Sequence, residues 1–171
     1  MSEQARPEAS SLPADVAEVE WRTRDATPKD IPAIAEAIAD LLLELGGSAP
    51  PHEQMRDAVQ AVLEDEALGC VIVAEAGERL IGVLAASWQH AIHVPGPYCI
   101  LQDLWTDPTW RSEGIGATLL CELFERMRGR GVTRVEVGLP SERFAALQAT
   151  AAFYDVNGFT ALGPRMRMVL P

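Results

Sequence analysis

An arginine and two glycines are closely spaced in the stretch TDPTWRSEGIGATLL, residues 106–120. An apolar run precedes the stretch, as in a buried strand, and a helical repeat of leucines follows it. A helix that begins after a strand leaves its first backbone N–H groups without partners, and these groups attract an anion together with the helix dipole. Gly114 and Gly116 allow a phosphate to approach the main chain, and Arg111 adds a permanent cation. The pattern predicts a pyrophosphate-binding loop; the alternative is a tight turn that binds nothing.

Two common phosphate-binding motifs do not account for this stretch. A P-loop is excluded, because no Gly-Lys-Ser/Thr sequence follows the glycines. The dinucleotide-binding fingerprint needs a third small residue where this chain has Leu119. It also needs a βαβ unit, whereas the upstream elements are predicted to form a hairpin. The Rossmann interpretation is therefore weak.

The elements that must position this loop alternate between strand and helix patterns. Runs of β-type residues predict strands at 19–26, 70–74, 80–88, 98–106 and 132–139, and a last strand or strand pair at 160–170. Apolar residues at helical spacing predict helices at 28–45, 52–67 and 141–157, and one after the glycines that ends at 129–131. Turn residues 77–79 predict an antiparallel hairpin. This order of elements indicates an α/β fold with a mixed sheet.

Length and composition indicate the number of domains and exclude some classes of partner. A chain of 171 residues suits one domain. Residues 1–18 have several acids and no apolar run, so we expect a disordered tail before a domain at 19–171. No apolar run is long enough to cross a bilayer, which predicts no membrane partner. The net charge of −11 argues against nucleic acid and is compatible with a cationic substrate.

Three cysteines, Cys70, Cys99 and Cys121, lie far apart in predicted core elements. Their odd number and wide spacing are typical of buried free thiols in a reducing compartment, and they indicate neither a disulfide framework nor a metal site. With no signal peptide in the first residues, we expect a cytoplasmic protein without a bound metal.

The segment LQDLWTDPTWRSEGIGATLL, residues 101–120, resembles the coenzyme-A-binding motif of the GNAT superfamily of N-acetyltransferases. The family signature, Arg/Gln-x-x-Gly-x-Gly/Ala after a strand, is met here with Pro108 three residues before the arginine. A second family motif, Phe-Tyr-x-x-x-Gly-Phe, is present at residues 153–159. The similarity covers about residues 19–170. It implies a single GNAT-like α/β domain, in which a mixed central sheet has helices on both faces and two parallel central strands splay apart.

The resemblance also implies where acetyl-coenzyme A would bind. The cosubstrate would lie where strands 98–106 and 132–139 separate, with its pantetheine arm along the first strand and its pyrophosphate on the loop. The implied cofactor-binding residues are Leu104, Trp105, Thr106, Arg111, Ser112, Glu113, Gly114, Ile115, Gly116 and Ala117. One backbone amide of the strand would stabilise the oxyanion. Many relatives have glycine at the position of Ser112.

The resemblance assigns a general acid but leaves several candidates for the general base. By resemblance, Tyr154 is the general acid that protonates the departing thiolate. Relatives with Leu-Glu-Asp-Leu can use the glutamate as a base, but this chain has Gln102, which can orient a water and cannot accept a proton. Asp103 is a substitute, although the two side chains alternate between faces unless a bulge intervenes. His90, His93, or an amine that arrives neutral are the remaining alternatives.

The implied reaction is acetyl transfer from acetyl-coenzyme A to a primary amine, in a small cationic molecule, by direct transfer in a ternary complex. We expect the acceptor pocket between the first two helices and the loops at 46–54 and 89–97. A covalent route is disfavoured, because the cysteines are predicted to be buried. A catalytically weak coenzyme-A-binding sensor or interaction module and a protein N-acetyltransferase are the alternatives. A homodimer is a further expectation, since relatives are often dimers and the segment 165–169 can pair across an interface.

Overall fold

The computed structural model describes residues 20–163 and 165–169 of the chain. The disordered tail predicted for residues 1–18 lies outside this range. The strands are β1 (Arg22–Asp25), β2 (Gly69–Ala76), β3 (Arg79–His90), β4 (Pro97–Thr106) and β5 (Val135–Val137). The helices are α1 (Ile31–Glu44), α2 (His52–Glu64), α3 (Ile115–Gly129) and α4 (Leu147–Val156), with short 3-10 helices η1 (Pro28–Asp30) and η2 (Pro108–Trp110).

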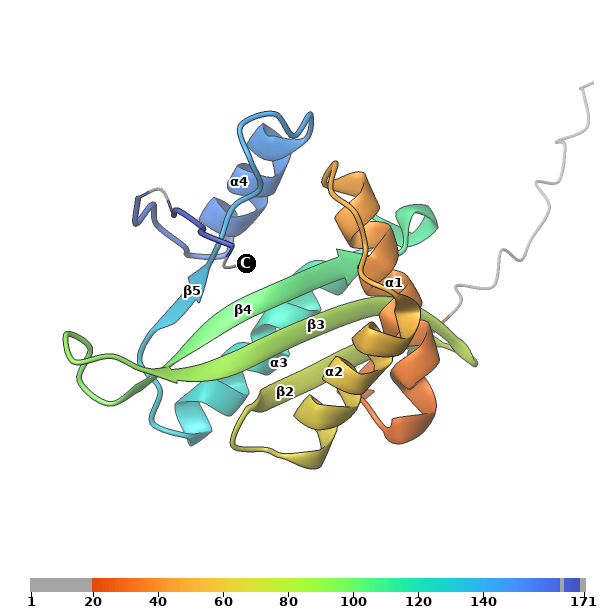
Figure 1. Ribbon diagram of the computed structural model, residues 1–171, viewed down its shortest axis with the longest axis horizontal. Coiled ribbons are helices and arrows are strands. Elements are labelled where there is room, and N and C mark those ends of the chain that lie inside the picture. The colour runs from red at the N-terminus through yellow and green to blue at the C-terminus, as the bar shows by residue number, and fades with distance from the viewer. Residues whose placement is uncertain (1–19, 164, 170–171) are drawn as a thin grey trace, which may run out of the picture.

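One mixed sheet contains the five strands in the order β1-β2-β3-β4-β5 (Figure 1). β1 to β4 are antiparallel neighbours, and Ala76 lies opposite Arg79 at the tight turn between β2 and β3. The predicted hairpin is therefore confirmed. β4 and β5 are parallel and pair from Cys99 opposite Val135 to Leu101 opposite Val137. The expected pair of parallel strands is thus present, with β5 at the edge of the described sheet.

β4 contains a bulge at Gln102. In the register with β3, Ala85 lies opposite Asp103, whereas the next residue of β3 lies opposite Leu101. Gln102 therefore has no partner of its own, and a bulge of this kind bends the strand and re-aims its side chains. Pairing with β5 ends at Leu101, although β4 itself continues. The two parallel strands consequently separate beyond the bulge.

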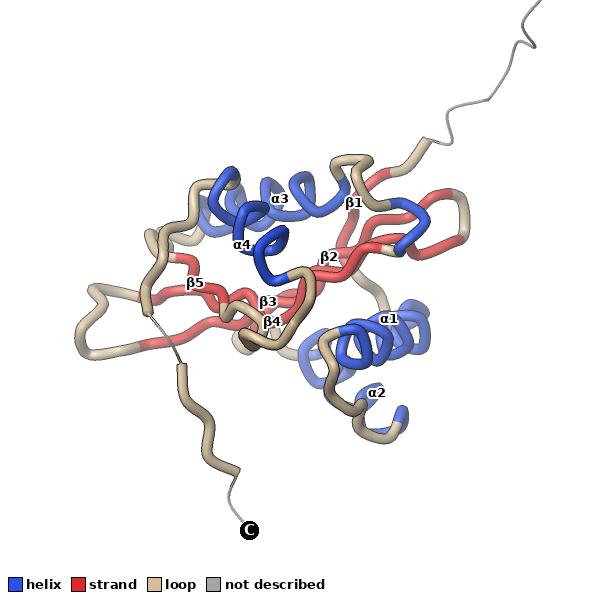
Figure 2. Tube along the Cα trace, turned by 90° about the horizontal axis from the view of Figure 1, so that it is seen from above, coloured by secondary structure: helices blue, strands red, loops and turns tan. Residues whose placement is uncertain are grey.

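Helices cover both faces of the sheet, as expected, with α3 and α4 on one side and α1 and α2 on the other (Figure 2). The core on the α3 side includes the buried helix residues Ile115, Leu119, Leu120, Leu123 and Met127. Gly82 of β3 lets α3 approach, because a Cβ at this position would lie 2.8 Å from Ile115 Cγ2. On the other face, Trp105 is buried beside Ile34 and Val83. β4 therefore contributes to both cores.

The start of α1 is fixed to β1 by an ion pair. The backbone N–H and the hydroxyl of Thr27 donate to Asp30 Oδ2 at 2.7 and 2.8 Å. Arg24 donates to both carboxylate oxygens of Asp30, at 2.7 and 2.9 Å. The Arg24 hydrogen bonds hold the pKa of Asp30 well below its usual range, against the opposing effect of burial. The predicted helix start at this position is confirmed, with one short 3-10 turn before α1.

Three predicted elements differ from the structure. The strand expected at 132–139 is limited to Val135–Val137, because Gly138 and Pro140 follow and proline cannot donate to a sheet. The helix expected from residue 141 begins at Leu147, after two turns. The last strand or strand pair expected at 160–170 is absent from residues 160–163 and 165–169. Alternation of apolar and basic residues suits a strand there, but alternation alone supplies no partner.

Within the described part of the chain, no helix is long and apolar enough to cross a membrane.

Candidate functional site

The turn that leaves β4 is held by Asp107. This buried carboxylate accepts hydrogen bonds from the backbone N–H and hydroxyl of Thr109, at 2.8 and 2.6 Å, and from Arg79 Nη2 at 2.5 Å. Burial would raise the pKa of Asp107, but these hydrogen bonds outweigh it and lower the pKa. The backbone N–H of Asp107 also donates to Ile81. The sequence analysis did not assign this residue, although an aspartate before proline is a common turn former.

The following loop turns sharply enough to open the N-terminus of α3. Ser112 and Gly114 both have left-handed backbone conformations, with φ of 72° and 79°. Ser112 is the only non-glycine residue with positive φ in the described range, a conformation that costs an L-residue about 1–2 kcal/mol. Gly114 caps α3 without any side-chain hydrogen bond. The N–H groups at the start of this helix therefore stay available for an anion.

The two sequence motifs contact each other at Gly116. A Cβ on Gly116 would lie 3.2 Å from Phe153 Cζ, so the lack of a side chain allows α4 to pack on the first turn of α3. Phe153 in turn contacts the ring of Tyr154 edge-on, with ring centroids 5.2 Å apart. The loop motif and the Phe-Tyr motif thus form one unit. The sequence analysis gave Gly116 the role of letting a phosphate approach. In the structure, its lack of a side chain also makes room for Phe153.

Tyr154 is buried, with 9% of its surface exposed. Its ring also contacts Phe159 edge-on at 5.3 Å between centroids. Burial raises the pKa of its phenol to about 12, and the negative charge of Asp103 acts in the same direction. The phenol is therefore protonated throughout the neutral range. The influence of Asp103 indicates that the two groups belong to the same region.

The bulge brings Gln102 and Asp103 to the same face of the sheet. Trp105 packs on the α1 side, and alternation places Asp103, two residues earlier, on that side too. Gln102 Nε2 donates to Ser87 Oγ at 2.8 Å. Ser87 faces the α1 side, because its neighbour Ala86 packs on the α3 side. The sequence analysis required a bulge for both side chains to share one face, and the structure has it.

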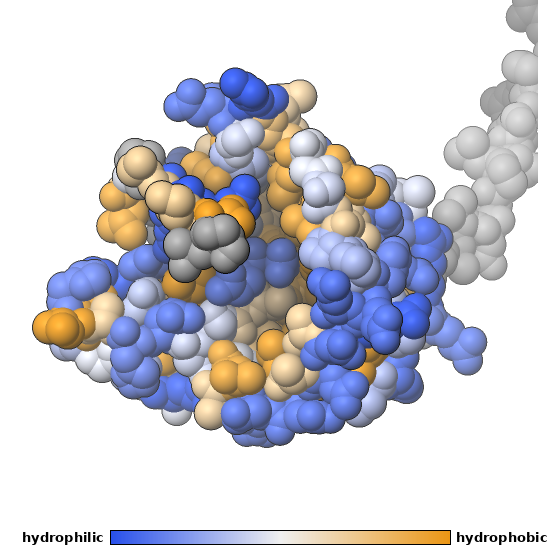
Figure 3. All heavy atoms as spheres, viewed as in Figure 1, coloured by the Kyte–Doolittle hydropathy of each residue, from blue (hydrophilic) through white to orange (hydrophobic). Residues whose placement is uncertain are grey.

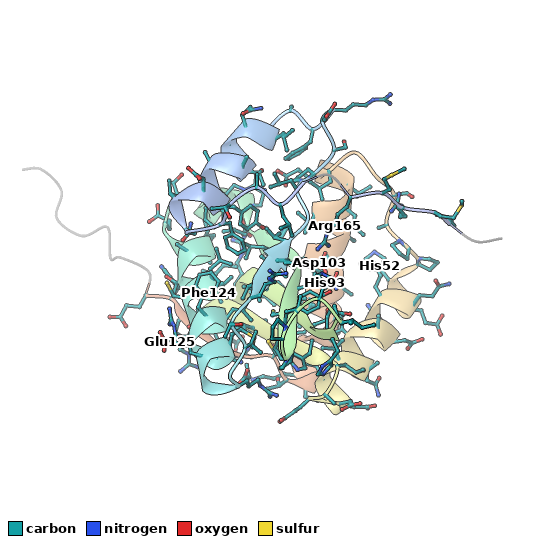
Figure 4. All side chains as sticks on the ribbon, turned by 90° about the vertical axis from the view of Figure 1, so that its left-hand side faces the viewer. His52, His93, Asp103, Phe124, Glu125 and Arg165 are labelled. Atoms are coloured by element: carbon teal, nitrogen blue, oxygen red, sulfur yellow. The ribbon has the colours of Figure 1, made fainter. Side chains whose placement is uncertain are left out.

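Asp103 lies at the centre of the molecule in Figure 4, with α3 and α4 on one side and α1 on the other. Burial raises the pKa of its carboxyl. A carboxylate of this kind is a stronger base than an exposed one.

Arg111 connects the loop to the end of α1. Its Nη1 and Nη2 donate to the two carboxylate oxygens of Glu44, at 2.9 and 2.6 Å. Its Nε is 3.4 Å from the carbonyl oxygen of Thr106. Both members of the ion pair are partly exposed. The sequence analysis placed the Arg111 side chain near the phosphates and did not anticipate this carboxylate.

A hollow of about 560 Å³ lies between the end of α1 and the segment that follows β5. Its lining residues are Leu45, Gly46, Ser141, Glu142 and Arg143. Figure 3 shows this face hollowed between the atoms over α1 and those over α4. The lining includes Gly46, where the loop at 46–54 starts, and no residue of the loop at 89–97.

The loop after β3 lies at the other end of the sheet. His90 is opposite Pro97 at the start of β4. Asp103 is six positions after Pro97, which is roughly 20 Å along a strand at about 3.3 Å per residue. The structure therefore does not bring His90 to the bulge, and His93 lies in the exposed loop beyond it.

The three cysteines differ in exposure. Burial raises the pKa of the Cys99 thiol to about 12 and also raises the pKa of Cys70. Cys121 is exposed, which corrects the prediction that it is buried. The buried residues of α3 form a stripe on its inner side. Cys121 falls between two of them in the sequence but lies on the outer side of the helix. Among the described residues, no group of three His, Cys, Asp or Glu side chains is arranged to hold a metal ion.

A model of the acetyltransferase (GNAT) family matches residues 35–159. No curated protein matches the chain. The chain is similar to a solved structure of the aminoglycoside N-acetyltransferase AAC(6')-Iy in complex with CoA, at 12% identity and a TM-score of 0.76, covering 92% of this chain and 99% of that one. A possible acetyltransferase from Clostridium difficile 630 gives 17% identity and a TM-score of 0.74, covering 88% and 98%.

A third similar structure is the aminoglycoside acetyltransferase meta-AAC0020 from an uncultured soil metagenomic sample, in complex with trehalose. Its sequence is 18% identical, the TM-score is 0.66, and the match covers 92% of this chain and 99% of that one. At identities this low, the similarity shows that these structures share the fold of this chain.

Proposed function

This chain belongs to the acetyltransferase (GNAT) family, whose members use acetyl-coenzyme A, and we propose that it transfers acetyl directly to a primary amine of a small cationic molecule. One observation carries the proposal. β4 and β5 separate beyond Leu101, and at the end of β4 the chain enters a helix whose first N–H groups have no side-chain cap. An open strand edge that leads to an anion site suits an amide-containing arm with a diphosphate at its end.

The residues of this cleft fit acetyl-coenzyme A. Beyond the bulge, the main chain of Leu104, Trp105 and Thr106 faces the side that β5 has left, and there it can pair with the pantetheine arm as a strand would. The loop and the start of α3 would hold the diphosphate through Arg111, Ser112, Glu113, Gly114, Ile115, Gly116 and Ala117. When bound, acetyl-coenzyme A supplies the acetyl thioester.

Tyr154 is the proposed general acid. The amine nitrogen forms a bond to the acetyl carbon, a backbone N–H of β4 stabilises the negative charge on the carbonyl oxygen, and the bond from carbon to sulfur breaks. Tyr154 then gives its phenolic proton to the sulfur and regains one from solvent. The pKa of about 12 keeps this proton on the phenol until the negative charge appears. Burial raises the pKa of a leaving thiolate in the same way, which favours the transfer.

Asp103 is the proposed base, and Gln102 the proposed orienting group. The buried carboxylate can take the proton that the attacking amine loses, directly or through a water. The amide of Gln102, fixed by its hydrogen bond to Ser87, can hold the water or the amine. Both groups lie on the α1 face of the sheet.

Direct transfer is favoured over a covalent acetyl-enzyme. A cysteine attacks as its thiolate, and burial raises the pKa values of Cys99 and Cys70. Cys121 is on the outer side of α3, away from the separated strands. The described chain therefore offers the cleft no activated thiol.

The acceptor is proposed to be small and cationic. The hollow of about 560 Å³ at the end of α1 suits a ligand of modest size. The net charge of −11 favours the approach of a cation. Two of the similar structures belong to aminoglycoside acetyltransferases, and aminoglycosides are polyamines of this class.

The experiment is a thiol-release assay with acetyl-coenzyme A and three amines: sisomicin, spermidine and a peptide with a free N-terminus. We expect release with a small cationic amine and little with the peptide. Mass spectrometry of the protein after acetyl-coenzyme A alone should detect no acetylated species. Binding of acetyl-coenzyme A without release for any amine would instead favour a coenzyme-A-binding module. Preference for the peptide would favour a protein N-acetyltransferase.

A further inference from the structure

The guanidinium group of Arg111 is engaged before any anion arrives. Both terminal nitrogens donate to the two oxygens of Glu44, at 2.9 and 2.6 Å, and Nε points to the carbonyl of Thr106 at 3.4 Å. A guanidinium binds a carboxylate or a phosphate through the same pair of N–H edges. Arg111 therefore cannot present this fork to a diphosphate while it holds Glu44.

Glu44 is the last residue of α1 and directly precedes the residues that line the hollow. Leu45 and Gly46 form one wall, and residues 141–143 form the other. The Arg111–Glu44 pair thus lies between the proposed diphosphate site and the proposed acceptor site. The hollow's own lining has two charged residues of opposite sign, Glu142 and Arg143, which together supply no net charge there.

We propose that Glu44 binds an ammonium group of the acceptor other than the reacting amine, and that Arg111 masks Glu44 until acetyl-coenzyme A is bound. The proposal rests on the function proposed for this site. A diphosphate carries more negative charge than one carboxylate and draws Arg111 away from α1. Glu44 then has no cation, and the entering amine replaces Arg111 as its partner. The resulting order is cofactor first and amine second.

The exchange is easily reversible, because both side chains are partly exposed, with 46% of the Arg111 side chain and 36% of the Glu44 side chain accessible. Exposed ion pairs of this kind are weak. We therefore expect Glu44 to reduce acetyl-coenzyme A affinity by only about two- to fivefold. By thermodynamic linkage, an amine that occupies Glu44 must raise the affinity for acetyl-coenzyme A by the same factor as the cofactor raises the affinity for the amine.

The test compares Glu44→Gln with wild type in a calorimetric titration of acetyl-coenzyme A. The variant should bind acetyl-coenzyme A about two- to fivefold more tightly, because Arg111 is free. Its KM for sisomicin or spermidine, whichever is turned over, should rise about two- to fivefold, with little change in kcat. Glu36→Gln, an exposed glutamate of the same helix, is the matched control and should change neither value.

Each of the other possible results would contradict one part of the proposal. Unchanged or weaker acetyl-coenzyme A binding by Glu44→Gln, with normal binding by wild type, would mean that Glu44 does not compete for Arg111. Tighter binding with an unchanged KM would show that Glu44 does not hold the amine. A folded wild-type protein that binds no acetyl-coenzyme A would refute the proposed function itself, and this inference with it.

Discussion

The proposed cofactor side and the proposed acceptor side of the cleft are built in different ways. On the cofactor side, β4, the turn at Asp107 and α3 follow one another along the chain, and the inner stripe of α3 is fully packed. On the acceptor side, the hollow joins residues 45–46 to residues 141–143, which are mostly exposed. The cofactor would be held by backbone groups that a buried helix fixes in place. The acceptor would be selected by surface side chains that can change at little cost to the fold.

The largest predicted effect is on the free energy of unfolding, for a leucine-to-alanine substitution made on each of the two sides. Leu119 of α3 is fully buried, whereas Leu43 of α1 is 60% exposed. Leu119→Ala should lower the free energy of unfolding by about 2–5 kcal/mol, because it leaves a cavity against the sheet. Leu43→Ala should change it by less than about 0.5 kcal/mol. Urea unfolding measures both, and similar losses for the two variants would remove the contrast between the sides.

The next effect concerns chemistry on the cofactor side. Tyr154→Phe removes the proposed proton donor and should lower kcat about a hundredfold, while acetyl-coenzyme A affinity is unchanged. Tyr98→Phe is the matched control, since the chain has only two tyrosines. Steady-state kinetics and calorimetry separate the two quantities. An unchanged kcat for Tyr154→Phe would assign the residue to packing with Phe153 and Phe159 alone.

A third prediction uses the buried charge between the two sides. Burial raises the pKa of Asp103 above the ordinary value of 3.8, so the folded state holds this proton more tightly than the unfolded state. The contribution of Asp103 to stability is therefore present below pH 3.8 and is lost as the pH rises through the raised pKa. Asp103→Asn should be more stable than wild type at neutral pH and about equal at pH 3.5.

Urea unfolding at the two pH values tests this, with Asp57→Asn on an exposed position of α2 as the control. A gain that is the same at both pH values would argue against a buried, titrating carboxyl at the bulge.

The smallest effect is expected in the loop itself. Ser112 has a φ of 72°, which glycine adopts without strain. Ser112→Gly should raise the free energy of unfolding by up to about 1 kcal/mol, part of the relief being offset by greater freedom of the unfolded chain. Ser48→Gly, at a loop position without positive φ, should be neutral or destabilising. Thermal unfolding of both variants decides whether the loop stores strain.

The sequence predicted the elements around the loop well because their signals are local. The apolar repeat, the glycines and Pro108 lie within one continuous stretch, the hairpin follows from the turn residues at 77–79, and the parallel pair of strands was implied by the family resemblance. The Phe-Tyr motif was also located correctly on α4. The contact of Gly116 with Phe153 could not be read from either motif, because it depends on how two helices meet.

The long-range contacts could not be predicted to the same extent, because they join distant parts of the chain. Arg111 and Glu44 are 67 positions apart, and nothing in either local pattern indicates the other. The bulge at Gln102 depends on the register with β3, which the sequence of β4 does not contain. The strand expected at 160–170 had a suitable alternation, but a strand needs a partner that alternation cannot specify.

The central claim, that the loop before α3 binds the diphosphate of acetyl-coenzyme A, is tested most directly by calorimetric titration of wild type, Gly114→Glu and Gly131→Glu. Both glycines have left-handed φ and open space around a Cβ, and they lie at opposite ends of α3. The two variants therefore carry similar strain and the same charge. We predict saturable binding by wild type and Gly131→Glu, and a loss of at least about a hundredfold by Gly114→Glu, whose carboxylate would face the phosphates. Equal binding by both variants, or none by the folded wild-type protein, would contradict the account.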